Sequence, residues 1–108
     1  MNKGEIWILD FPSKSGKEQE GTRPAIILAT TEVGMIISIP LTSKIQAKKF
    51  PHTVLINKSE RNNLEQDSIA LIFQIRALDK QKFRYKVGNL EDYYLHKIDK
   101  ELKSLLKI

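Results

Sequence analysis

The sequence predicts a mainly β fold of the α+β class: a small, strongly bent antiparallel barrel closed by one C-terminal amphipathic helix. Three observations predict it. Short apolar segments rich in β-branched residues alternate with polar loops over most of the chain. Apolar residues then recur at helical spacing near the C-terminus. The length of 108 residues is that of one domain, so residues 1–108 are expected to fold as a single unit.

The predicted strands are short, and the first of them is nearly continuous in apolar residues. That segment, EIWILDF, is expected to be buried on both faces. Pro24 stands where a strand can begin without breaking a ladder. A turn at 31–34 makes the second and third strands a hairpin. In chain order, the expected elements are strands at Glu5–Phe11, Pro24–Thr30, Met35–Leu41, Thr53–Asn57, Ser68–Ile75 and Arg84–Val87, with a short helical turn at Asp79–Phe83.

The expected helix follows Asn89, which is predicted to cap it. Asp92 stands three residues later, in the position of a capping-box acid. The apolar stripe of this helix consists of Tyr94, Ile98, Leu102 and Leu105, widened by Leu95 and Leu106. Its lysines lie mostly off that stripe, so we expect the apolar face to pack on the sheet or on a partner.

Composition limits the classes of function that remain. The net charge of +5 favours polyanionic partners, among which nucleic acid is the commonest in a cell. The absence of cysteine excludes disulfides, thiolate metal sites and a cysteine nucleophile. No signal-peptide pattern or membrane-length apolar segment occurs. We therefore expect a cytoplasmic protein with no membrane partner.

No motif for a metal or a cofactor stands out. The sequence has no Gly-rich phosphate loop, no paired-His metal helix and no Ser-His-Asp elbow. His52 and His96 are isolated from each other and from other metal-ligand residues, and both are interpreted as surface histidines. The sequence therefore predicts neither a metal site nor a cofactor.

Two polar loops carry the residues that suit chemistry. The first loop, 13–22, ends beside Arg23, and the second begins at Thr42. Because antiparallel neighbours bring the start of one strand beside the end of the other, the predicted hairpin places Arg23 near Thr42. An arginine stays charged and donates two parallel hydrogen bonds to a phosphate. Such a group of residues suits a phosphodiester.

Cleavage of RNA by its own 2′-hydroxyl needs a proton acceptor, a proton donor and positive charge near the phosphorane. Arg23 suits the charge, Thr42 can hold a phosphate oxygen or pass on a proton, and Glu18 is the carboxylate best placed as a base. The alternative interpretation is a surface salt bridge from Arg23 to a neighbouring glutamate, with Thr42 merely opening a loop.

Several blocks of the sequence resemble the MazF/PemK toxins of bacterial toxin–antitoxin pairs. The blocks are GEIW at 4–7, GKEQEGTRP at 16–24, IPLTS at 39–43, PHTV at 51–54, DS at 67–68 and QIRALDK at 74–80. The resemblance spans nearly the whole chain, and the EQ-x-G-x-R-P pattern is its most specific part.

The resemblance implies an SH3-like barrel that forms a homodimer and is blocked by a cognate antitoxin protein. It also implies metal-independent cleavage of single-stranded RNA such as mRNA at short sequences, leaving a 2′,3′-cyclic phosphate and a 5′-hydroxyl. By the same resemblance, Arg23 and Thr42 are catalytic, as is Glu18 in some members. The residues expected to bind RNA are Lys17, Gln19, Ser43, Lys44, Gln74 and Arg76; for the last two a purely structural role remains open.

The chain also departs from part of the family. In the Kid/PemK branch, a catalytic arginine and aspartate of the third block fall at positions that are Leu71 and Phe73 here, and neither can transfer protons. The proton carriers must then come from the first two motifs.

Two other functions stay open: a non-enzymatic toxin of the same fold that poisons DNA gyrase, and a degenerate barrel that binds RNA without cutting it. Trp7 is expected in the core or at a dimer interface rather than as a stacking platform.

Overall fold

The long strand β3 (Met35–Thr42) organises the sheet, because strands from both halves of the chain pair with it. The structure, a computed structural model, describes residues 1–11 and 21–108. The described strands are β1 (Glu5–Phe11), β2 (Gly21–Thr30), β3 (Met35–Thr42), β4 (Thr53–Ile56), β5 (Ser68–Leu71), β6 (Arg76–Asp79) and β7 (Phe83–Asn89). The helices are η1 (Ile45–Lys49), η2 (Ile72–Gln74) and η3 (Lys80–Lys82), all of 3-10 type, and α1 (Asp92–Leu106).

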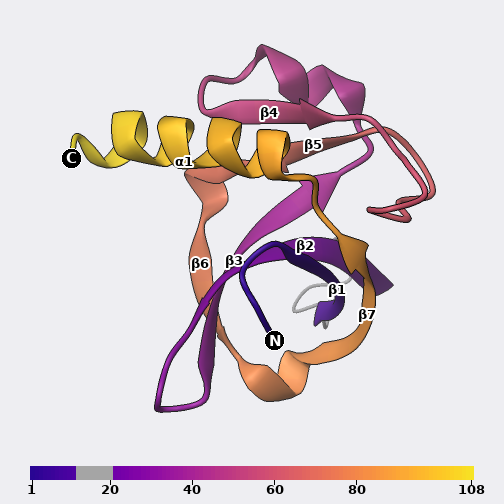
Figure 1. Cartoon of the computed structure of the whole chain (residues 1–108), viewed down its shortest axis with the longest axis vertical. Coiled ribbons are helices and arrows are strands. Elements are labelled where there is room, and N and C mark those ends of the chain that lie inside the picture. The colour runs from indigo at the N-terminus through magenta and orange to yellow at the C-terminus, as the bar shows by residue number, and fades with distance from the viewer. Residues whose placement is uncertain (12–20) are drawn as a thin grey trace.

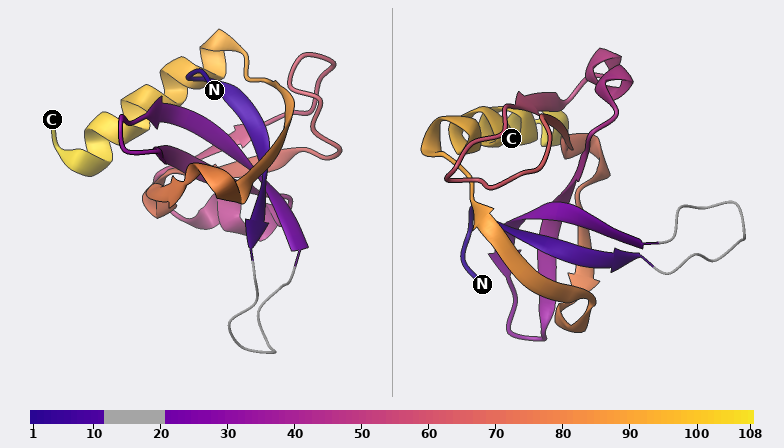
Figure 2. Two further views of the ribbon diagram at one scale, coloured as in Figure 1. Left: turned by 90° about the horizontal axis from the view of Figure 1, so that it is seen from below. Right: turned by 90° about the vertical axis from the view of Figure 1, so that its right-hand side faces the viewer.

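The seven strands form one sheet in which every pairing is antiparallel (Figure 1). Its order is β4-β5-β3-β2-β1-β7, and β6 pairs with the first half of β3. The sheet is strongly curved, and α1 lies along one side of it (Figure 2). The predicted fold class is confirmed, although the path of paired strands stays open between β4 and β7.

Strand β1 contributes to two hydrophobic clusters on opposite faces. Ile6 belongs to the larger cluster and Leu9 to the smaller one, and both are almost fully buried. Because residues an odd number of positions apart point to opposite faces of a strand, both faces of β1 are covered, as predicted. Trp7 packs against the smaller cluster, and its Nε1 donates a hydrogen bond to Glu5 Oε1 at 2.8 Å.

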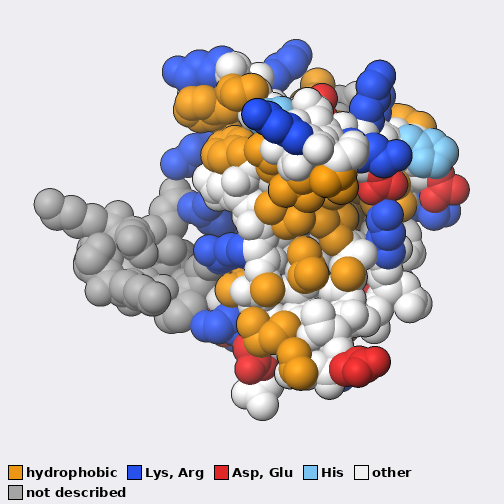
Figure 3. Space-filling model, turned by 90° about the vertical axis from the view of Figure 1, so that its left-hand side faces the viewer, with side chains coloured by type: hydrophobic (Ala, Val, Ile, Leu, Met, Phe, Trp, Pro, Cys, Tyr) orange, Lys and Arg blue, Asp and Glu red, His pale blue; other side chains and the backbone are white. Residues whose placement is uncertain are grey.

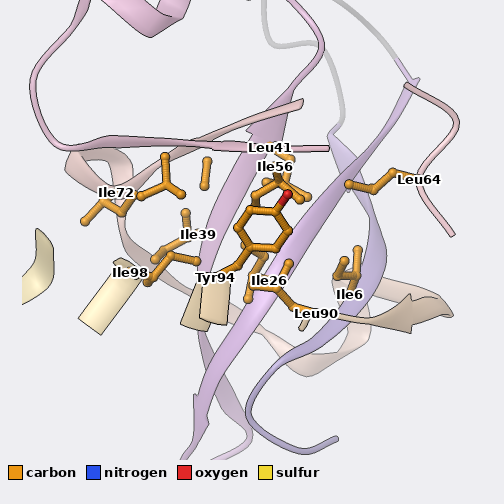
Figure 4. Packing of buried hydrophobic residues seen from close by; sticks show 12 residues of the cluster. Ile6, Ile26, Ile39, Leu41, Ile56, Leu64, Ile72, Leu90, Tyr94 and Ile98 are labelled. Atoms are coloured by element: carbon orange, nitrogen blue, oxygen red, sulfur yellow. The ribbon is translucent and has the colours of Figure 1, made fainter. Parts of the chain in front are cut away.

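Helix α1 closes the larger cluster, as the apolar stripe predicts. Figure 4 shows Tyr94 and Ile98 directed among Ile26, Ile39 and Ile56 of the sheet. The partly buried residues of the stripe, packed against the same cluster, are Leu95, Leu102 and Leu105, whereas Leu106 is 53% exposed and lies outside it. None of the helices described in residues 1–11 and 21–108 has the length and hydrophobicity of a membrane span.

The predicted cap of α1 is wrong. Asn89 is the last residue of β7, where it pairs with Glu5, and Glu91 takes the N-cap position. Neither a capping box nor any side-chain cap hydrogen bond forms there, because the Glu91 carboxylate instead accepts hydrogen bonds from Ser59 and Asn62. The helix start is set by this tertiary contact.

The single strand predicted at Ser68–Ile75 is also wrong. The chain pairs with the end of β3 through β5, turns through η2, and then pairs with the beginning of β3 through β6. Ile72 in the turn is fully buried, and its N–H donates to the carbonyl of His52 at 3.1 Å. The apolar segment predicted as one strand therefore consists of two strands, β5 and β6, with a bend at η2 between them.

Strand β2 begins at Gly21 rather than at Pro24. Pro24 pairs with Ile8 of β1, while the β2–β3 ladder starts only at the next residue, Ala25. The proline thus stands at the open end of that ladder, where a missing N–H is tolerated.

Candidate active site

A groove of about 590 Å³ opens where the β2–β3 hairpin meets the loop 57–67. The register of the hairpin pairs Ala25 with Pro40, and its continuation by two residues sets Arg23 opposite Thr42. Both side chains are partly buried and line the groove. The predicted hairpin therefore brings these two residues to one site.

A second hollow, of about 600 Å³, shares Arg23 and Thr42 with the groove as lining residues. Residues of η1, η2 and the segments beside them form its walls. Arg23, Thr42 and Lys44 line both hollows. These three residues therefore border two spaces that are each large enough for part of a nucleotide chain.

Two backbone contacts fix the position of Thr42, one from β5 and one from the loop that follows β3. It pairs with Ile69 of β5 at the end of β3. Its Oγ1 accepts a hydrogen bond from the backbone N–H of Lys44 at 3.2 Å, which fixes the first turn of the following loop. The hydroxyl proton of Thr42 can still be donated to a bound group.

The other predicted residues divide into three groups. Ser43 and Lys44 line the groove, and Gln74 lines the second hollow. Arg76 lies in β6 opposite Ser38 and lines neither space. The predicted residues Lys17, Glu18 and Gln19 lie outside the described residues.

The loop 57–67 forms the wall that faces the hairpin, and a buried asparagine holds it. Asn62 is fully buried. Its Oδ1 accepts from the N–H groups of Ser59 and Leu64 at 3.0 and 3.1 Å, and its Nδ2 donates to the carbonyl of Asn57 at 2.9 Å and to Glu91 Oε1 at 3.1 Å. A polar group so deeply buried is stable only when it is hydrogen-bonded this fully.

Glu91 ties this wall to the start of α1. Burial disfavours its charged form, but hydrogen bonds outweigh that effect and lower the pKa of the Glu91 carboxyl below its usual value of 4.5. The donors are Ser59 Oγ, at 2.7 Å from Oε2, and Asn62. The carboxylate therefore stays charged and keeps the loop attached.

Gly88 allows β7 to approach the same loop. A Cβ built on Gly88 would lie 2.5 Å from the carbonyl oxygen of Asn62 and 2.7 Å from that of Arg61. The neighbouring N–H of Asn89 donates to the carbonyl of Arg61 at 3.0 Å. Loop and strand thus meet backbone to backbone.

The loop adds groove residues that the sequence interpretation missed. Asn63, Glu65 and Gln66 line the groove, as do Tyr85 and Lys86 of β7. Among the described lining residues, Glu65 is the carboxylate. The sequence marks this loop only as polar, and its approach to the hairpin depends on the contact with β7 and α1.

Positive charge surrounds Arg23 and Thr42. The described charged residues lining the groove are Arg23, Lys44, Lys86 and Glu65, and those lining the second hollow are Arg23, Lys44 and Lys49. Figure 3 shows a column of Lys and Arg side chains along one edge, next to a large apolar patch. Both spaces therefore suit a polyanion.

The histidines take no part in either space. His52 Nδ1 lies 3.1 Å from Glu101 Oε1 on α1, and His96 is exposed on that helix. Within residues 1–11 and 21–108, no group of three or more His, Asp or Glu side chains comes together in a way that could hold a metal ion.

Solved structures share this fold. A chain of the MazE–MazF crystal structure from Deinococcus radiodurans is 25% identical, with a TM-score of 0.79, covering 100% of this chain and 96% of that one. A Mycobacterial endoribonuclease in complex with its cognate antitoxin has a TM-score of 0.75 at 17% identity, covering 98% of this chain and 94% of that one. The second likeness concerns the fold alone.

Sequence comparison defines the family. Residues 2–106 match the model of the PemK-like, MazF-like toxins of type II toxin–antitoxin systems. Endoribonuclease EndoA of Bacillus subtilis (strain 168) is 31% identical over 113 residues, which span 100% of this chain and 96% of that protein. The chain therefore belongs to the PemK-like, MazF-like toxin family.

Proposed function

We propose that this toxin is an endoribonuclease that cleaves single-stranded RNA, including mRNA, at short specific sequences without a metal ion. The observation that carries the proposal is that Arg23 and Thr42 together line two adjoining spaces whose other described charged residues are mostly lysines. Membership of a family that includes an endoribonuclease 31% identical to this chain supports it.

The proposed reaction is a transesterification within the RNA. A carboxylate removes the proton of the 2′-hydroxyl, the 2′-oxygen attacks the adjacent phosphorus, and the 5′-oxygen leaves with a proton. The products are a 2′,3′-cyclic phosphate and a 5′-hydroxyl. The Arg23 guanidinium stabilises the negative charge of the phosphorane, and the Thr42 hydroxyl holds a phosphate oxygen or passes on a proton.

Two carboxylates are candidates for the base. Glu18 belongs to the first motif, and Glu65 lines the groove from the loop 57–67. We assign the base to Glu18, because its motif also contains Arg23. Lys17, Gln19, Ser43 and Lys44 are proposed to bind the RNA.

The proposed partners follow from the family. A cognate antitoxin protein is expected, since the structures that share this fold include MazE–MazF and an endoribonuclease in complex with its antitoxin. A homodimer is proposed from membership of the MazF-like toxin family. An antitoxin that presents acidic or apolar extended segments would complement the basic groove. The proposed place of action is the cytoplasm, where mRNA is translated.

The test is cleavage of single-stranded RNA in EDTA by the purified protein and by Arg23→Ala. We expect the wild type to cut and the variant to lose at least about a hundredfold in rate, because a preorganised charge at the transition state is removed. Arg84→Ala is the matched control. The Arg84 side chain is 56% exposed, lies 2.9 Å from Asp10 Oδ2 and lines neither space.

Undiminished cutting by a folded Arg23→Ala protein would overturn the assignment of Arg23. Salt-dependent binding of RNA without any cleavage by the wild type would identify a degenerate barrel instead. Intact RNA together with stalled gyrase–DNA complexes would identify a gyrase poison.

A further inference from the structure

Two phenylalanines stand exposed beside each other in the second hollow. Phe50 is 48% exposed and Phe73 is 40% exposed. Their ring centroids are 5.9 Å apart, with an interplanar angle of 66°. Single exposed apolar residues are common, whereas a contacting aromatic pair that lines a hollow indicates a surface that binds something.

The backbone that carries the two rings is anchored. The Phe50 N–H donates to the carbonyl of Ala47 at 3.1 Å, and the Phe50 carbonyl accepts from Thr53 Oγ1 at 2.9 Å. Phe73 follows the fully buried Ile72 within η2. The rings are therefore presented on anchored backbone, which reduces the entropy lost when a ligand binds.

The surroundings of the pair select an anionic ligand with a flat, partly polar group. The charged residues described around this hollow are Arg23, Lys44 and Lys49, all of them cations. Lys49 Nζ lies 5.8 Å from the centroid of the Phe50 ring. Gln46 and Gln74 add amides that can both donate and accept hydrogen bonds. An acidic or purely apolar partner would leave one of these features unused.

We propose that Phe50 and Phe73 form a stacking platform for the nucleobase of the RNA nucleotide next to the cleaved phosphate. The inference rests on the proposed function and adds the residues that bind one base. The base stacks on the exposed ring surface, Lys49 approaches the phosphate of the same nucleotide, and Gln74 contacts the edge of the base. Because Arg23 and Thr42 border the same hollow, the stacked base directly adjoins the reacting phosphate.

The test measures binding of an RNA oligonucleotide that carries 2′-deoxyribose at the cleaved nucleotide, so that it binds without being cut. Phe50→Leu and Phe73→Leu, singly and together, keep an apolar side chain but remove the ring. We expect the double variant to lose between about fivefold and about 150-fold in affinity, the range for one stacked base. Phe73→Trp with Phe50 unchanged keeps an aromatic ring at position 73 and should bind the oligonucleotide more tightly than Phe73→Leu.

An abasic scan locates the base. In the wild type, an abasic nucleotide at one position beside the cleaved phosphate should weaken binding by the same factor as the double variant. In the double variant, the same abasic nucleotide should cost almost nothing more, because the two changes remove one contact. The control variant is Val33→Ala, which changes a side chain 81% exposed at the turn between β2 and β3, at the other end of β3.

Several results would overturn the platform. One is equal affinity of the folded double variant and the wild type. Another is an abasic penalty that persists undiminished in the double variant. A third is loss of antitoxin binding with RNA binding intact, which would make the pair a protein-docking surface. A wild type that cuts RNA alongside any of these results leaves the proposed function standing, whereas a wild type that neither binds nor cuts RNA overturns both.

Discussion

Arg23 and Thr42 meet because of the register of a single hairpin. A short turn at 31–34 pairs β2 with β3, so the end of one strand lies beside the start of the other. This adjacency could be predicted from the sequence, since it depends only on local pairing. The partner that takes the proton could not be predicted in the same way, because one candidate, Glu65, reaches the groove from a distant loop.

The two candidate bases can be separated by amide substitutions of the same size. We expect Glu18→Gln to lower the cleavage rate by about a hundredfold or more, because general-base catalysis contributes factors of that order. Glu65→Gln should change the rate far less, since an amide keeps the shape of the groove wall. Single-turnover cleavage across a range of pH measures both. A pH-dependent loss in Glu65→Gln, with Glu18→Gln active, would move the base to Glu65.

The elements that surround the groove were predictable to different degrees. Alternating apolar segments and polar loops predict most strands, and helical spacing predicts α1. The corner at η2 was missed because an apolar segment reads the same whether it is straight or bent. The Phe50–Phe73 pair and the loop 57–67 were missed because each joins segments whose approach is set by tertiary packing.

The contact of β7 with this loop predicts the effect of a single methyl group. Gly88→Ala places a Cβ against the carbonyl of Asn62, and backbone cannot move away as a flexible side chain can. We expect a loss of about 1–3 kcal/mol in the free energy of unfolding, together with weaker RNA binding as the groove wall shifts. Urea unfolding measures the first effect. Ser104→Ala, at an exposed position of α1, is the control and should stay within about 0.5 kcal/mol.

A Gly88→Ala protein as stable as the Ser104→Ala control would show that the loop is not held against β7 as described.

At the scale of the whole molecule, the curvature of the sheet determines where the positive charge gathers. The chain has a net charge of +5, and the curved sheet brings several of its cations to the two spaces around Arg23 and Thr42. Positive charge at a hollowed surface attracts RNA and raises its local concentration. The net charge could be read from the sequence, but its concentration at these two spaces depends on the fold.

The proposed mechanism requires the RNA to supply its own nucleophile, the 2′-hydroxyl, beside Arg23. It is tested most directly by mass measurement of the products from two matched RNA oligonucleotides, one all-ribose and one with 2′-deoxyribose at the cleaved nucleotide, both in EDTA. We expect a 2′,3′-cyclic phosphate and a 5′-hydroxyl from the first, and no cut at that position in the second. Cleavage at the deoxy position, or a product with a 5′-phosphate, would contradict it.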